Sequence, residues 1–173
     1  MDELTHNFTH VFSVVFSDWG STHPLVIHFP IALYFVAPIF ILAGLIFKKR
    51  SKTFYTSALI LMVLGLAAVF TALSSGESAA EHLKPDSTVV ETLGEHDELA
   101  HRTRNIFVIL TVTFFIFVLL QNKFDKKAHR QPQAIFLILF LLAYLFGLLT
   151  LLNTAHYGGK LVHYHGIHSQ FFK

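Results

Sequence analysis

Residues 25–47 have the sequence LVIHFPIALYFVAPIFILAGLIF, an apolar run of 23 residues in which His28 is the one side chain that can be charged near neutral pH. A helix of about 20 apolar residues crosses the roughly 30 Å of hydrocarbon in a bilayer. Three further stretches approach or reach that length, at about residues 54–74, 104–121 and 133–153. The sequence therefore predicts an all-α membrane protein, a single domain over residues 1–173 in which four transmembrane helices form an up-down bundle.

The parts outside the four spans are also predicted to be largely helical. Residues 4–19 place apolar side chains at helical spacing, which is typical of an amphipathic helix lying in the membrane interface with Trp19 as an anchor. In the long second loop, residues 77–83 extend the second span and residues 89–104 lead into the third, with a break at 84–86. No convincing repeat is visible, although the spans pair naturally as two hairpins.

Three prolines mark the first span. Pro24 suits the first position of a helix, where its missing N–H costs nothing. Pro30 and Pro38 lie further along, and each removes one backbone hydrogen bond. We therefore expect the first transmembrane helix to be kinked.

The charges of the loops indicate an orientation. The short loops KKRSK (48–52) and NKFDKKAHR (122–130) are basic, whereas residues 74–103 hold seven acids against two bases. Lys and Arg concentrate on the cytoplasmic side of membrane proteins. We therefore expect a multi-pass membrane protein with both termini and the acidic loop outside, in contact with lipid and with no nucleic-acid partner. In a bacterium this means the inner membrane, with the outer face in the periplasm.

Histidines gather at the face that this topology places outside. Imidazole is a common ligand of haem iron and of transition metals. The chain has no cysteine, which excludes thiolate metal sites, iron–sulfur clusters and covalent haem attachment. The spans lack acidic and basic side chains near mid-membrane, which is unlike a channel or a secondary transporter. The candidates for cofactor binding are His23, His28, His96, His156 and His165.

Four short motifs carry a resemblance to a known family. They are HPLVIHFP (23–30), SGESA (75–79), EHDELA (95–100) and GGKLVHYHG (158–166), and they occur in this order over nearly the whole chain. Together they resemble the DUF2231 family of bacterial four-helix membrane proteins. The resemblance marks His23, His28, Pro30, Gly76, Glu77, His96, Gly158, Gly159 and His165. The family has no settled function, but its relatives often accompany cytochrome domains, which implies a redox role.

Three functions remain open at this point, and the sequence does not decide whether the protein is an enzyme. The first is a b-type cytochrome-like subunit that binds haem b through His23, His28, His96 and His165. The second is a zinc or copper site built from the same four histidines and Glu77. The third is a membrane anchor whose histidines bind nothing. The acidic loop would suit a basic redox partner such as a periplasmic cytochrome c, and the protein could form oligomers.

Two local expectations concern the site. We expect His23 to cap the helix that begins at Pro24, so that it leaves the helix and can turn back toward the bundle. We expect the Gly158-Gly159 pair to turn the chain sharply, so that His165 folds back over the bundle end.

Overall fold

Four long helices dominate the part of the chain that the structure describes. The structure, a computed structural model, describes residues 17–81, 83, 87–124 and 130–167 together with Thr9 and Ser13. In chain order its elements are η1 (Gly20–Thr22), α2 (His23–Val26), α3 (His28–Ile46), η2 (Lys48–Arg50), α4 (Ser51–Glu81), α5 (Ser87–Phe124) and α6 (Arg130–His163). The expected interfacial helix at 4–19 falls mostly, and the break at 84–86 wholly, outside the described residues.

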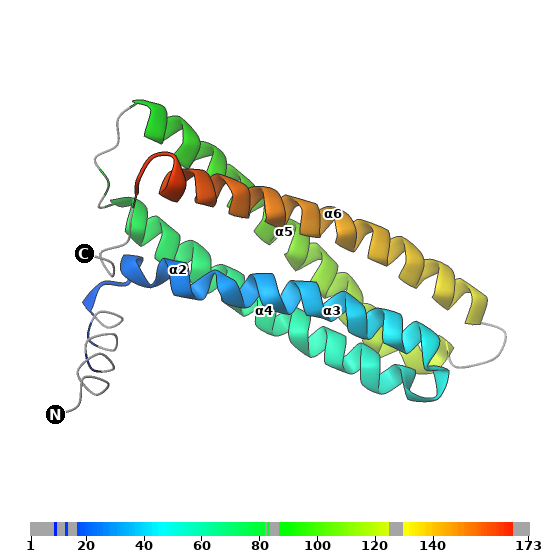
Figure 1. Cartoon of the computed structure of the whole chain (residues 1–173). Coiled ribbons are helices and arrows are strands. Elements are labelled where there is room, and N and C mark those ends of the chain that lie inside the picture. Colours follow the sequence, from blue (N-terminus) through cyan, green and yellow to red (C-terminus); the bar gives the residue numbers. More distant parts are fainter. Residues whose placement is uncertain are drawn as a thin grey trace.

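The helices run up and down in turn, as Figure 1 shows. Four segments of the described chain are long and apolar enough to cross a membrane: Gly20–Ile46, Lys48–Glu81, Thr88–Gln121 and Pro132–His163. Many of their apolar side chains point outward, for example Ile109 at 66% exposure. A lipid-facing surface explains this exposure, because acyl chains solvate such side chains as well as a core does. The predicted all-α membrane bundle is confirmed.

The arrangement of the helices defines the two ends of the bundle and the pairs of helices that lie diagonally opposite each other. The starts of α2 and α5 and the ends of α4 and α6 share one end, which we call the histidine end (Figure 1). Each helix packs on the next around the bundle: α3 on α4, α4 on α5, α5 on α6, and α6 back on α3. The pairs α3 and α5, and α4 and α6, therefore lie across the bundle from each other.

The first span is interrupted near its start, as its prolines predict. The helix breaks at Ile27, between α2 and α3, although the N–H of Ile27 still bonds the carbonyl of His23. Pro30 follows three residues later and has no N–H to offer the carbonyl of Val26, so the regular helical pattern cannot continue through this turn.

Pro38 affects a backbone hydrogen bond in the core. Because it lacks an N–H, the Tyr34 carbonyl four residues earlier loses its helical donor. The hydroxyl of Tyr144, on α6, donates to that carbonyl at 2.9 Å, inside the buried core. This bond links the first and last spans where a bare carbonyl would face hydrocarbon.

Replacing Tyr144 with phenylalanine should therefore destabilise the bundle through the Tyr34 carbonyl. We expect a loss of roughly 1 kcal/mol, the usual size for an interhelical hydrogen bond in a membrane protein. The loss should shrink when Pro38→Ala restores the missing backbone N–H. Unfolding equilibria in detergent of the single and double variants would measure this coupling, and equal costs in both backgrounds would contradict it.

Candidate histidine pair

His23 is held at the histidine end by α4. Its Nδ1 lies 3.0 Å from the carbonyl oxygen of Ala72 and 3.0 Å from Oγ of Ser75, which in turn donates to the same carbonyl. Since a carbonyl oxygen only accepts, Nδ1 is the protonated nitrogen of the neutral ring, and Nε2 keeps its lone pair. This tautomer is the one that metal-ligating histidines commonly adopt. The expected contact of His23 with the bundle is confirmed, but the expectation that His23 is the cap was wrong: α2 begins at His23 itself, and Thr22 is the cap.

His96 is held in the same way by the other hairpin. It lies on α5, two turns into the helix, and its Nδ1 lies 3.0 Å from the carbonyl oxygen of Thr154 on α6. The same reasoning leaves Nε2 of His96 free. The hydroxyls of Thr103 and Thr154 bond to each other at 2.9 Å beside it, and Thr103 is buried.

The two imidazoles face each other across the bundle. Their ring centroids lie 6.5 Å apart, and the ring planes are inclined at 86°. Each ring is half-buried and packs on a glycine of the neighbouring helix. A Cβ atom on Gly76 would lie 3.0 Å from Cε1 of His23, and one on Gly158 would lie 3.1 Å from Cε1 of His96. Both glycines thus provide room for an imidazole.

The remaining sequence candidates lie apart from this pair. His28, Glu77 and His156 are exposed. The Nε2 atom of His165 lies 2.9 Å from the Thr92 hydroxyl and so connects the end of the chain to α5. Within the part of the chain that the structure describes, no three His, Asp or Glu side chains come close enough together to hold a metal ion.

The chain reversal after α6 is not where the sequence suggested. Gly158 and Gly159 continue α6, which ends at His163. The reversal lies at Gly166, with a φ of 68°, after which the N–H of Ile167 bonds the carbonyl of Leu161. The expectation of a turn at 158–159 was wrong, because both residues remain helical and Gly158 packs against His96.

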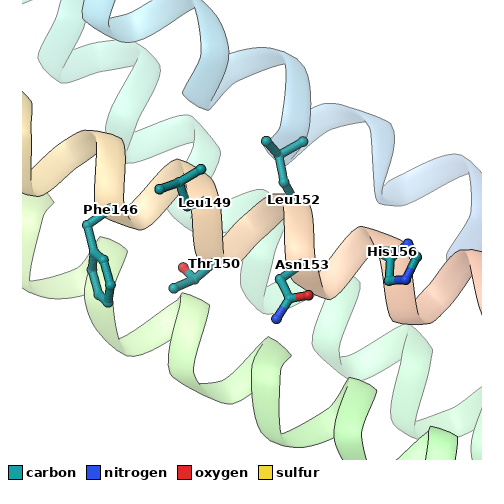
Figure 2. A pocket seen from close by; sticks show the side chains of 6 residues that line it. All are labelled: Phe146, Leu149, Thr150, Leu152, Asn153 and His156. Carbon is teal, nitrogen blue, oxygen red and sulfur yellow. The ribbon is translucent and has the colours of Figure 1, made fainter.

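A shallow groove of about 540 Å³ lies along α6, and Figure 2 shows that all its side chains come from this one helix. It is lined by Phe146, Leu149, Thr150, Leu152, Asn153 and His156. Most of these side chains are exposed on a membrane-spanning helix, so the groove opens to the surroundings of the bundle. It does not include His23 or His96.

Sequence reasoning identified both histidines but not what holds them. The carbonyls of Ala72 and Thr154 belong to the backbone and carry no signal in the sequence. Gly76 was marked only by the family resemblance, without a role, and Gly158 was expected to form a turn. One available signal of this packing was a glycine at the same level as a histidine on the neighbouring span, because a glycine permits the close approach of an imidazole ring.

Comparison with known proteins gives one match. A family described as "Predicted membrane protein (DUF2231)" matches residues 21–170, and this range includes the histidine pair and all four spans. No curated protein and no solved structure matches the chain. Since the match covers most of the sequence, the chain belongs to the DUF2231 family of predicted membrane proteins.

Proposed function

We propose that His23 and His96 bind the iron of one b-type haem, and that the protein is a redox subunit of the bacterial inner membrane. The observation that carries the proposal is the pair of opposed imidazoles, each with Nδ1 tied to a helix carbonyl and Nε2 free. Haem iron, when bound, supplies one-electron transfer. The chain's own part is to hold two ligands apart at a fixed distance and angle.

The spacing of the rings supports two ligands on one iron. Two metal–nitrogen bonds of about 2 Å each, and about 1 Å from nitrogen to ring centre at either end, give a centroid separation of roughly 6 Å. The observed separation of 6.5 Å is close to this value. The glycines at 76 and 158 provide space beside the Cε1 atoms of both rings.

The number of ligands favours haem over zinc. Two imidazoles fill both axial positions of a haem iron but only half of a tetrahedral zinc shell. The described residues bring no third His, Asp or Glu into position to complete such a shell. Of the four histidines first considered for haem, the geometry therefore supports His23 and His96.

We also place the histidine end in the periplasm. The short connection at Lys48–Arg50, at the opposite end, is basic. Glu77, Glu81, Glu91, Glu95, Asp97 and Glu98 are exposed at or near the histidine end. This distribution supports a cytoplasmic location for the basic end. A haem near the periplasmic face could exchange electrons with a soluble partner there.

An absorption spectrum of the purified protein tests the proposal. Protein produced in cells supplied with haem precursor should carry one haem per chain, and its Soret band should sharpen and shift when dithionite is added. A colourless protein with stoichiometric zinc or copper would instead support the metal site, and a protein free of both would support the anchor role. Either of these two results would overturn the haem proposal.

A further inference from the structure

The two halves of the bundle bury equivalent positions. We call α2–α4 the first hairpin and α5–α6 the second. Adding 73 to each buried position of α3 gives a buried position of α5, in the pairs Pro30/Thr103, Tyr34/Phe107, Ala37/Leu110, Ile41/Phe114 and Gly44/Phe117. Adding 82 does the same for five of the six buried positions of α4, in the pairs Tyr55/Leu137, Ala58/Phe140, Met62/Tyr144, Gly65/Gly147 and Val69/Leu151; the sixth, Ser75, maps onto the half-buried Tyr157.

A shared burial pattern alone is common among helix bundles, because every core-facing helix buries a similar stripe. The contacts within each hairpin are an independent test of the two offsets. The offset of 73 maps His23 onto His96. The offset of 82 maps the Ala72 carbonyl, which binds His23, onto the Thr154 carbonyl, which binds His96. The offset of 82 also maps Gly76 onto Gly158, and these are the two glycines against which the rings pack.

A second glycine contact repeats in the middle of the bundle. A Cβ on Gly65 would lie 2.8 Å from the ring of Tyr34, and one on Gly147 would lie 3.3 Å from the ring of Phe107. Tyr34 and Phe107 are equivalent under the first offset and stack on each other, with centroids 3.7 Å apart and planes at 8°. Equivalent residues thus meet each other at two levels of the bundle.

These observations place a pseudo-twofold axis along the bundle. It relates the diagonal partners α3 and α5, and likewise α4 and α6. It passes between the rings of Tyr34 and Phe107 and between those of His23 and His96. An axis in this direction keeps both hairpins the same way up, so each contributes its histidine to the same end.

We infer that the chain is two copies of one histidine-bearing helical hairpin, paired about this axis, and that Gly76 and Gly158 are equivalent positioning residues for the two imidazoles. The part that concerns a ligand rests on the proposed function; the pairing of the hairpins rests on the contacts alone. The repeat escaped the sequence analysis because residues 23–44 and 96–117 share identical residues only at 23/96 and 28/101, both histidine. Between the two halves of a repeat in a membrane protein, side-chain size and packing contacts are retained more than residue identity.

The effect of each glycine on its histidine follows from the geometry. The ring of His23 is bonded through Nδ1 to the carbonyl of Ala72, one helical turn before Gly76. It therefore cannot tilt away from a Cβ at position 76 without lengthening that bond. His96, Thr154 and Gly158 form the same arrangement. An alanine at either position should displace the adjacent ring, and with it the Nε2 atom, from its present position.

The test compares Gly76→Ala and Gly158→Ala with Gly159→Ala and Gly94→Ala, whose added Cβ atoms would meet nothing within 4 Å. In haem-loaded protein, each of the first two variants should convert most of the low-spin iron to high-spin, to a similar extent. The two controls should keep the wild-type spectrum. Wild-type spectra in both test variants, or a change in only one of them, would overturn the inference.

A second measurement needs no cofactor and separates this inference from the haem proposal. Diethyl pyrocarbonate modifies accessible neutral imidazoles, and mass spectrometry reports the extent at each histidine. In protein stripped of haem, Gly76→Ala should raise modification of His23 severalfold and leave His96 unchanged, and Gly158→Ala should do the reverse. Unchanged modification in both would refute the positioning role, whereas the expected pattern in a protein that never binds haem would refute only the proposed function.

Discussion

His23→Ala and His96→Ala should each abolish haem loading while leaving the bundle intact. Under the proposed function, each change would remove one of the two residues that hold the haem iron, and the described residues offer no third His, Asp or Glu beside the pair to replace it. The core that stabilises the four helices lies deeper, around Tyr34, Phe107 and Phe114. The protein should therefore still insert, purify as the same species and keep its helical circular dichroism.

The matched controls are His28→Ala and His165→Ala. Both are candidates from the sequence, but His28 is exposed and His165 is bonded to Thr92, so neither faces the pair. We expect haem per chain, measured as the pyridine haemochrome, to stay near the wild-type ratio in both. Loss of haem in His28→Ala with retention in His96→Ala would show that the wrong ligand was assigned.

Neutralising the acidic face should slow electron exchange with a basic partner. The carboxylates of Glu91, Glu95 and Glu98 are exposed on the first turns of α5, near His96. A concentrated negative field raises the association rate of a positively charged protein at low salt. Changing all three to glutamine should lower the rate of electron transfer to a basic cytochrome c by roughly tenfold at low ionic strength.

The structure refines this expectation residue by residue. Glu98 forms an ion pair with Arg102, so part of its field is already neutralised, and its single variant should have the smallest effect. Physiological salt should remove most of the difference, since the Debye length falls to about 8 Å. The control neutralises Lys48 and Lys49 at the opposite end, which should change nothing. A rate that ignores both salt and the three glutamates would exclude steering.

The fold was predictable because length and hydropathy decide it. Each span is long and apolar, and a bilayer admits only helices of that kind or closed barrels. The helical extension before the third span was also predictable, and α5 begins at Ser87. The continuation of α6 through Gly158 and Gly159 was not, since glycine is compatible both with a turn and with close helix packing.

The site was predictable in part. Histidines at one end of a bundle follow from topology, and His23 and His96 were among those named. Their pairing was not predictable, because it depends on which spans lie across the bundle from each other. The bonds to Ala72 and Thr154 were not predictable either, since any residue carries a backbone carbonyl. His28 is five residues from His23, about 140° around a helix, and the structure leaves it on the surface.

The angle between the two rings gives the most direct test of the central claim. Low-temperature electron paramagnetic resonance of the oxidised, haem-loaded protein reports the relative orientation of two axial imidazoles. The 86° between the planes of His23 and His96 predicts the strongly anisotropic low-spin signal, with a large maximal g value, that perpendicular imidazoles produce. A high-spin signal, or the rhombic low-spin signal of parallel imidazoles, would contradict ligation of one haem by this pair.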